Sequence, residues 1–212
     1  MPNPGEPPAQ NGSPYSPLQR RELARMVVNK LLERPCVPLA ELERFRGAGV
    51  YAIYYTGDFP EYKPLVSVGE CKIPIYVGKA EVEGRRRGAI DLGDASYSGV
   101  SLYNRLREHA RSIEQANNLC VEDFRCRYLV VEDIWIPLAE ALLIQTFRPL
   151  WNVVVDGFGI HDPGSGRSRQ RRSDWDMLHP GRPWAARLPP GNSPKEIKKR
   201  IRRHLGNLAS SH

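Results

Sequence analysis

Two short runs of apolar and aromatic residues constrain the fold of this chain more than any other feature. They are GVYAIYY at residues 49–55 and PIYVG at residues 74–78. β-Branched and aromatic side chains bounded by glycine are typical of short buried strands. Each run also holds a tyrosine close to a glycine, the residue that permits close approach to the backbone. We therefore expect two strands that present phenol groups at a crowded position.

The rest of the chain alternates helical and extended patterns. Helices are predicted at 17–34, 37–45, 101–116, 136–147 and 193–205, and further strands at 65–70 and 124–133. The apolar stripes are Leu23, Met26, Val27 and Leu31 in the first helix, Leu102, Leu106, Ala110 and Ile113 in the third, and Ile197, Ile201 and Leu205 in the last. The expected fold class is α+β, with a small central antiparallel sheet of about three strands flanked by helices. An N-terminal helix and a basic C-terminal extension complete it.

Positive charge is concentrated at the C-terminal end. The chain has a net charge of +7, and from Gly166 onward there are 12 Lys and Arg against 3 Asp and Glu. A basic segment attached to a near-neutral body suggests either a polyanionic partner or a solubilising tail, and charge alone does not separate the two. Composition divides the chain into a disordered segment at 1–16, a helical arm at 17–46, a core at 47–157 with an insertion at 58–74, and a basic extension at 158–212.

Cysteine usage and hydropathy predict a cytoplasmic protein. Cys36, Cys71, Cys120 and Cys126 show neither a C-x-x-C pair nor histidines at metal spacing, so we expect reduced thiols. The N-terminus lacks the basic start and apolar middle of a signal peptide, and no apolar run is long enough to span a bilayer. No membrane partner is expected.

The polar residues near the predicted strands prove little one at a time. Tyr51 and Tyr76 suit strands because the ring packs and the hydroxyl reaches an edge. Arg105 and His109 are four residues apart on one helix, so they leave the same face, which is most simply a solvated basic face.

Glu140 is harder to explain as an ordinary structural residue. It interrupts the apolar helix IPLAEALLIQTF, where a carboxylate is costly without a partner such as a metal or an arginine. Asn152 follows just beyond, where a turn or cap residue is the ordinary interpretation. The ordered set is Gly49-Val50-Tyr51, Tyr76-Val77-Gly78-Lys79, Arg105 with His109, Glu140 on a helix, and Pro149-Leu150-Trp151-Asn152.

This set resembles the GIY-YIG nuclease superfamily over roughly residues 45–155, the whole nuclease module. Both name motifs carry Val in place of Ile, which keeps an apolar strand position apolar. Twenty-four residues separate Tyr51 from Tyr76, more than in compact members of the superfamily. The insertion, the single module and the basic extension are similar to the type II restriction endonuclease branch, in particular to enzymes that cut a GC-rich palindrome such as CCGCGG.

The resemblance implies a catalytic site made of Tyr51, Tyr76, Arg105, His109, Glu140 and Asn152. Glu140 would hold one Mg²⁺ per active site, and Arg105 would neutralise charge on the phosphate. Tyr51 would act as general base or position the water, with His109 as its proton relay. Tyr76 would hydrogen-bond water or phosphate, and Asn152 would fix the site from the far side. Gly49 and Gly78 are expected to leave room for DNA.

Recognition of a particular DNA sequence requires residues outside the catalytic set. A palindromic DNA site also implies a homodimer, with one active site for each strand. Arginine and lysine are the usual readers of guanine, although phosphate contact is the commoner role for each. The candidates for DNA contact are Lys79, Arg85, Arg86, Arg87, Arg167, Arg169, Arg171, Arg172 and Arg182. Lys79 is equally well interpreted as a solvated lysine after a strand. The partners implied are double-stranded DNA and, in the same cell, a cognate DNA methyltransferase that it need not touch.

Two other functions remain open at this stage. One is a structure-specific or nicking GIY-YIG nuclease of repair or mobile elements, for which the chain leaves little room for a separate binding domain. The other is a non-catalytic nucleic-acid-binding module, which the retained tyrosines, arginine and glutamate argue against.

Overall fold

The chain folds around one antiparallel sheet. The computed structural model describes residues 20–82, 99–160 and 170–209. Within these ranges β1 (Val37–Pro38), β2 (Gly49–Tyr55), β3 (Tyr76–Ala80) and β4 (Phe124–Val130) form a four-stranded sheet in the order β1-β4-β2-β3. The pairings are all antiparallel, as predicted, with one strand more than the three expected. The described part of β3 is therefore an edge of the sheet.

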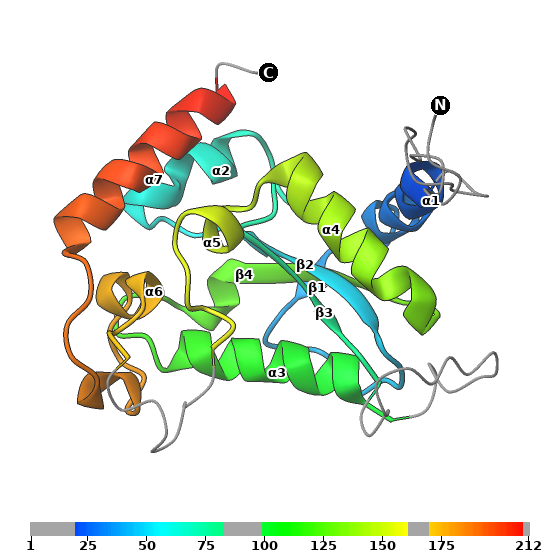
Figure 1. Ribbon diagram of the computed structural model, residues 1–212, viewed down its shortest axis with the longest axis horizontal. Coiled ribbons are helices and arrows are strands. Elements are labelled where there is room, and N and C mark those ends of the chain that lie inside the picture. The colour runs from blue at the N-terminus through cyan, green and yellow to red at the C-terminus, as the bar shows by residue number, and fades with distance from the viewer. Residues whose placement is uncertain (1–19, 83–98, 161–169, 210–212) are drawn as a thin grey trace, which may run out of the picture.

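Helices cover both faces of the sheet, which confirms the α+β class. In Figure 1, α3 (Ser101–Glu114) runs along one face, while α4 (Ile136–Phe147) and α1 (Arg20–Leu32) lie on the other. Every residue of β2 is buried: Tyr51, Ile53 and Tyr55 join the apolar cluster that includes α3, and the alternate residues join the cluster of α1 and α4. Because both faces are covered, the strand is apolar throughout instead of alternating with polar residues.

The C-terminal extension packs onto the same core. Its elements are α6 (Asp174–Leu178) and α7 (Pro194–Ala209), and the predicted apolar stripe of α7 is buried against the segment that contains Tyr62 and Leu65. The remaining short helices are α2 (Lys63–Ser67), which lies beside α7 in Figure 1, and α5 (Leu150–Val153). None of the helices in the three described ranges is long and apolar enough to cross a membrane.

Two short predicted elements are wrong. The helix expected at 37–45 is instead the two-residue strand β1 followed by irregular chain, because Leu39 donates its backbone N–H to the Phe124 carbonyl at 2.9 Å. The strand expected at 65–70 is instead α2, which has Pro64 in its first turn and buries Leu65. Short apolar runs fit either structure, and proline near the start favours the helix.

The N-terminal helix is confirmed, but its buried face is not the predicted one. Ala24, Val28 and Leu31 are buried, whereas the side chain of Met26 is 68% exposed. The predicted stripe favoured large apolar residues over the small Ala24, whereas Val28 and Leu31 are the α1 residues that join the apolar cluster of α4.

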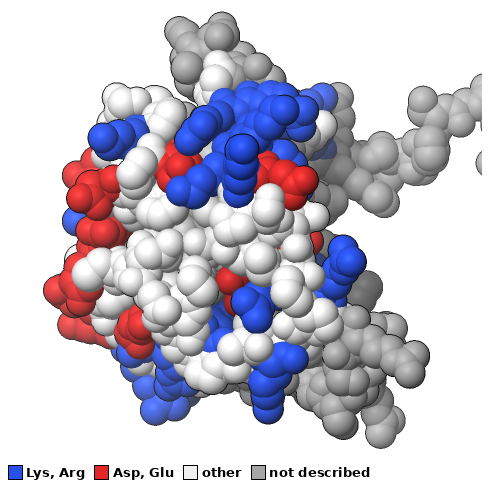
Figure 2. All heavy atoms as spheres, turned by 90° about the vertical axis from the view of Figure 1, so that its left-hand side faces the viewer, with Lys and Arg blue, Asp and Glu red and all other residues white. Residues whose placement is uncertain are grey.

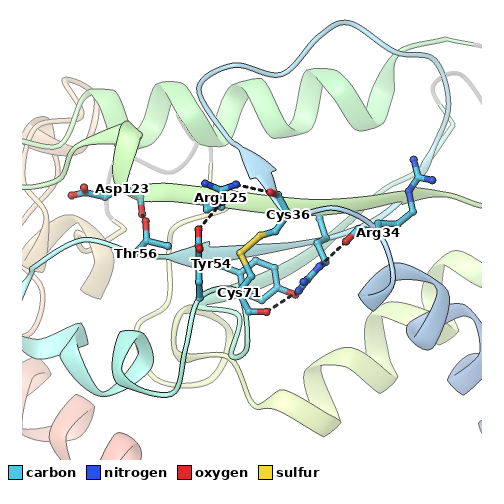
Figure 3. Close-up of a disulfide and its surroundings, with 9 residues drawn as sticks. Arg34, Cys36, Tyr54, Thr56, Cys71, Asp123 and Arg125 are labelled. Carbon is cyan, nitrogen blue, oxygen red and sulfur yellow. Dashed lines mark hydrogen bonds and ion pairs between the residues drawn. A yellow bond between two sulfur atoms is a disulfide. The ribbon is translucent and has the colours of Figure 1, made fainter.

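A disulfide joins Cys36 to Cys71, so the expectation of four reduced thiols is wrong. The two residues are 35 apart in the sequence, and Arg125 of β4 holds the first of them by donating to the Cys36 carbonyl at 2.7 Å (Figure 3). Cys120 and Cys126 are free thiols. The pairing could not be derived from spacing, because it depends on the fold that brings the segment after α1 against the end of the 58–74 insertion.

Candidate active site

Tyr51 and Tyr76 lie on adjacent strands, with ring centroids 6.3 Å apart. Tyr51 pairs with Gly78 across the β2–β3 ladder, and a Cβ at Gly78 would lie 2.3 Å from the Tyr51 hydroxyl. A Cβ at Gly49 would lie 2.0 Å from the Leu129 carbonyl oxygen. The expectation that these glycines make room for DNA is therefore corrected. They make room for a phenol and for a neighbouring strand.

His109 lies within hydrogen-bonding distance of Tyr51. The distance from its Nε2 to the Tyr51 hydroxyl is 2.6 Å, and its ring is 2% exposed and stacked on Phe158 at 4.6 Å. The aromatic packing fixes the plane of the imidazole, and α3 places it opposite β2. The geometry suits proton exchange between the phenol and the imidazole.

Arg105 precedes His109 by one helical turn and lies beside both phenols. Its Nη1 is 3.2 Å from Glu108, and its Nη2 donates to the Gly159 carbonyl at 2.9 Å. A Cβ at Gly159 would crowd Tyr76 and Arg105, at 2.7 and 3.2 Å, so glycine is needed here too. Gly159 was missed in the sequence because nothing nearby marks it.

Both phenols are held in the neutral form. Burial raises the pKa of Tyr51 well above its ordinary value, and the charges of Tyr76 and Glu140 add to that effect, while Arg105 opposes it. Burial likewise raises the pKa of Tyr76, with Arg105 opposing and Glu140 adding. Tyr51 is therefore a neutral phenol at pH 7, and it can accept a proton only by passing its own to a partner.

Glu140 reaches the site from α4 and pairs with Lys79. The Lys79 Nζ is 3.4 Å from Glu140 and 2.8 Å from Glu81. Burial raises the pKa of the Glu140 carboxyl, and the lysine partly opposes the rise. Lys79 thus has a defined role in the described structure, since it supplies positive charge at an otherwise costly carboxylate.

Glu140 would be the protein carboxylate that holds a cation at this site. Among residues 20–82, 99–160 and 170–209 no group of three or more His, Cys, Asp and Glu side chains gathers around a common point. Lys79 already stands as a positive charge beside the carboxylate. Mg²⁺ tolerates one protein carboxylate, because water and phosphate oxygens complete its coordination.

Asn152 serves the backbone of β3. Its Oδ1 accepts from the Val77 N–H at 2.8 Å, and its Nδ2 donates to the Val77 carbonyl at 2.9 Å. Trp151, next to it on α5, donates its backbone N–H to the Ile75 carbonyl at 2.9 Å. The amide therefore pairs the outer edge of β3 as a neighbouring strand would, and it keeps Tyr76 in position.

An open pocket borders these groups. Its volume is about 540 Å³, and it lies between the end of β3 and the start of α3. The lining residues are Lys79, Ala80, Glu81, Ser101, Asn104, Arg105 and Glu108. Arg105 and Lys79, the lysine beside Glu140, thus share a solvent-accessible concavity.

The nine DNA-contact candidates separate into distinct groups. Arg85, Arg86, Arg87, Arg167 and Arg169 lie outside the described residues. Arg171 is exposed, whereas Arg172 donates to the carbonyls of Ala185, Ala186 and Leu188. The expectation that Arg182 contacts DNA is wrong. Its side chain is 2% exposed, pairs with Asp176 at 2.6 Å and donates to three backbone carbonyls, so its role is structural.

The structure also contains a second tyrosine–histidine pair that the sequence did not reveal. The Tyr62 hydroxyl is 2.6 Å from His179 Nε2, and the other ring nitrogen lies 2.9 Å from Asn118 Oδ1. Trp151 Nε1 donates to the same hydroxyl at 2.9 Å. The partners are 117 residues apart, so no local pattern could have indicated the pair.

The site and fold together define a nuclease of the GIY-YIG class, in which two strand tyrosines face a helical arginine and histidine. Residues 43–205 match the family described as the Eco29kI GIY-YIG domain, so the chain belongs to this family of type II restriction endonucleases, whose namesake cuts CCGCGG. The match takes in most of the basic extension, beyond the 45–155 range of the resemblance. A comparison with curated proteins finds no match.

Proposed function

We propose that this protein cuts both strands of a GC-rich palindrome, CCGCGG or a close relative, with one Mg²⁺ per active site. Membership of the restriction endonuclease family supports the reaction class. The observation that carries the proposal is the 2.6 Å contact of Tyr51 with His109, located beside Arg105 and within electrostatic reach of Glu140. Phosphodiester hydrolysis requires a proton acceptor, positive charge on the phosphate and a metal-holding carboxylate, and this cluster offers each of them.

Tyr51 and His109 would act as one proton-accepting unit. As water attacks phosphorus, its proton passes to the Tyr51 oxygen while the phenol proton passes to His109 Nε2. This requires the imidazole to hold its other proton on Nδ1. The raised pKa of Tyr51 makes such a coupled transfer necessary, because the free phenolate is scarce at neutral pH.

Arg105, Tyr76 and Glu140 would stabilise the phosphate. The Arg105 guanidinium is charged at any working pH and neutralises the extra negative charge of the pentacovalent state. The Tyr76 hydroxyl donates to a phosphate oxygen or to the attacking water. Mg²⁺ held by Glu140 would supply a Lewis acid for the phosphate and the leaving oxygen, which takes its final proton from water.

We further propose a homodimer, in which twofold symmetry places one site on each DNA strand. The proposed cytoplasmic location rests on hydropathy alone, because the Cys36–Cys71 disulfide removes the argument from cysteine usage. The disulfide ties the segment after α1 to the 58–74 insertion, so these two elements form one cross-linked unit. Met26 on α1 and Val68 in the 58–74 insertion expose large apolar side chains, which suits an interface. Arg85, Arg86, Arg87, Arg167, Arg169 and Arg171 stay as candidates for base or phosphate contacts.

Plasmid digestion with Mg²⁺ tests the proposal. Discrete fragments whose sequenced ends share one palindrome are expected, together with a dimer in size-exclusion chromatography with light scattering. Nicked circles alone would indicate a single-strand nuclease. A mobility shift without any cleavage, identical in wild type and Glu140→Gln, would indicate a non-catalytic binding module.

A further inference from the structure

A second concavity lies where α4, α5 and α7 meet, away from the pocket beside Arg105. Its volume is about 390 Å³. The lining residues are Arg148, Val153, Val154, Arg200, Arg203 and His204. We call it the α7 pocket. Three arginines in one small concavity repel one another unless an anion compensates them.

The carboxylates of the described chain compensate only one of these arginines. Arg200 pairs with Asp174, whose side chain is largely buried and also accepts from Asn192 at 2.8 Å. Arg148 and Arg203 form no ion pair within residues 20–82, 99–160 and 170–209. The pocket therefore keeps about two uncompensated positive charges, which is the electrostatic signature of an anion site.

The two flanks of α7 differ in this respect. Lys198 and Arg202 reach Glu61, at 3.1 and 3.6 Å, so the flank facing the 58–74 insertion is partly neutralised. The flank facing α4 and α5 is the one with the free positive charge. Figure 2 shows Lys and Arg side chains gathered toward the top of the face over α7.

Arg148 is placed in the pocket at a conformational cost. It ends α4 with φ 44° and ψ 55°, a left-handed conformation in which glycine is normal, and the next residue is Pro149. Proline disfavours helical conformations of the residue before it, so arginine is a poor choice for the backbone alone. His204 donates from Nε2 to the Arg148 carbonyl at 3.0 Å and holds this cap in place. A costly conformation that persists points to a role for the side chain.

The pocket adjoins the active site across one short helix. Val153 and Val154 line it, and the preceding residue, Asn152, is bonded to β3 on the other side of α5. A helix is about 10–12 Å across with its side chains, which corresponds to roughly three nucleotide steps along a DNA strand.

We propose that the α7 pocket binds a backbone phosphate of the substrate DNA a few nucleotides from the cleaved bond. The inference rests on the proposed nuclease function and adds a site to it. Arg148 and Arg203 grip the phosphate oxygens, and Arg200 contributes its charge while it stays paired with Asp174. The contact positions the strand and reads no base.

Binding to a duplex that contains CCGCGG tests the proposal, measured by fluorescence anisotropy at several KCl concentrations in a Glu140→Gln background. Arg148→Gln with Arg203→Gln should weaken binding about tenfold and make the slope of log K against log salt shallower by about 1. The matched control is Lys195→Gln with Lys199→Gln, which removes the same charge from exposed positions on α7 outside the pocket. It should leave the slope unchanged. Arg203→Gln alone, which leaves the left-handed cap untouched, should show part of the same loss.

Three results would overturn the inference. An unchanged slope in the arginine variant, with its melting temperature intact, shows that the pocket holds no phosphate. Equal losses in the arginine and lysine variants show a diffuse charge effect. If the Glu140→Gln parent binds no duplex at any salt concentration, the nuclease proposal itself is overturned. If the wild-type protein binds DNA but does not cleave it, the nuclease proposal fails alone, and the first two comparisons still decide whether the α7 pocket binds phosphate.

Discussion

Two tyrosine–histidine pairs lie in this molecule with almost the same local geometry and very different surroundings. In each, a buried phenol oxygen is 2.6 Å from a histidine Nε2. Tyr51 and His109 adjoin Arg105 and are bordered by an open pocket that Arg105 lines. Tyr62 and His179 lie inside the apolar cluster, where Asn118 and Trp151 supply further hydrogen bonds.

The difference shows that a hydrogen-bonded phenol and imidazole are not in themselves a catalytic device. Burial, with Lys198 adding, lowers the pKa of His179 to about 3, so that ring cannot take up a proton at neutral pH. Both ring nitrogens of His179 have hydrogen-bond partners, and such a satisfied network holds the segments that carry Tyr62 and His179 in one arrangement. The first pair is joined by a guanidinium and a carboxylate whose charges act on the phenol. Both pairs are buried, so the Arg105 guanidinium and the open pocket that it lines distinguish their surroundings.

The largest effect should come from removing Glu140, the carboxylate whose charge acts on the Tyr51 phenol. Glu140→Gln should lower the cleavage rate by about a thousandfold or more, because the metal loses its protein ligand, while DNA binding changes little. Cleavage of a labelled duplex and anisotropy binding measure the two effects. Glu132→Gln, at an exposed position just before α4, is the matched control and should cut normally. Full activity of Glu140→Gln would remove glutamate from the mechanism.

Substituting each of the two histidines in turn should separate a role in catalysis from a role in stability. His109→Gln should lower kcat about a hundredfold, since the proton relay is lost, and should also lower the melting temperature because the buried Tyr51 hydroxyl loses its partner. Raising the pH to 9 should not restore activity, because the pKa of Tyr51 lies well above its ordinary value.

The matching variant is His179→Gln, measured in the same assays. It should leave kcat nearly unchanged below the melting transition and cost about 1–3 kcal/mol of unfolding free energy, because Tyr62 and Asn118 lose a partner. If both variants lose stability and neither loses turnover, the two pairs are equivalent and the assignment of the active site is wrong.

A smaller effect concerns the dependence of stability on pH. His179 is neutral when folded down to a pKa of about 3 and has an ordinary pKa of 6.5 when unfolded. The unfolded chain therefore binds one more proton between these values, so stability is complete above pH 6.5 and falls as the pH drops toward 3. The slope from this group is about 1.4 kcal/mol per pH unit. Urea unfolding from pH 7 to 4.5 should show a shallower slope for His179→Gln than for His109→Gln.

Much of the site was predictable, because its residues recur in one order along the chain. Tyr51, Tyr76, Arg105 and His109 lie together, and the charge of Glu140 acts on both phenols, while their catalytic roles stay a prediction. Long periodic elements such as α3 and α4 were also predicted to within a few residues, since their apolar stripes span several turns. The short elements near residues 37–45 and 65–70 were wrong because local preference is weak there and packing decides.

The role of Asn152 shows how far motif reasoning reaches. The resemblance implied that this amide fixes the site from the far side, and the structure shows how it does so: the amide pairs with the Val77 backbone, which the location of β3 at the edge of the sheet makes possible. Arg182 and Arg203 look alike in the sequence, yet one is closed in by Asp176 and three carbonyls and the other lines an anion-sized pocket.

Local chemistry in the chain was enough to specify β2, β3, β4 and the long helices, because these depend on side-chain type and on spacing along a helix or strand. Long-range packing alone decided which sulfurs bond, which histidine is fully buried and which arginines of the described residues form ion pairs. Burial and charge compensation depend on neighbours that are distant in the sequence, and their energies are set only when the sheet, α4 and α7 come together.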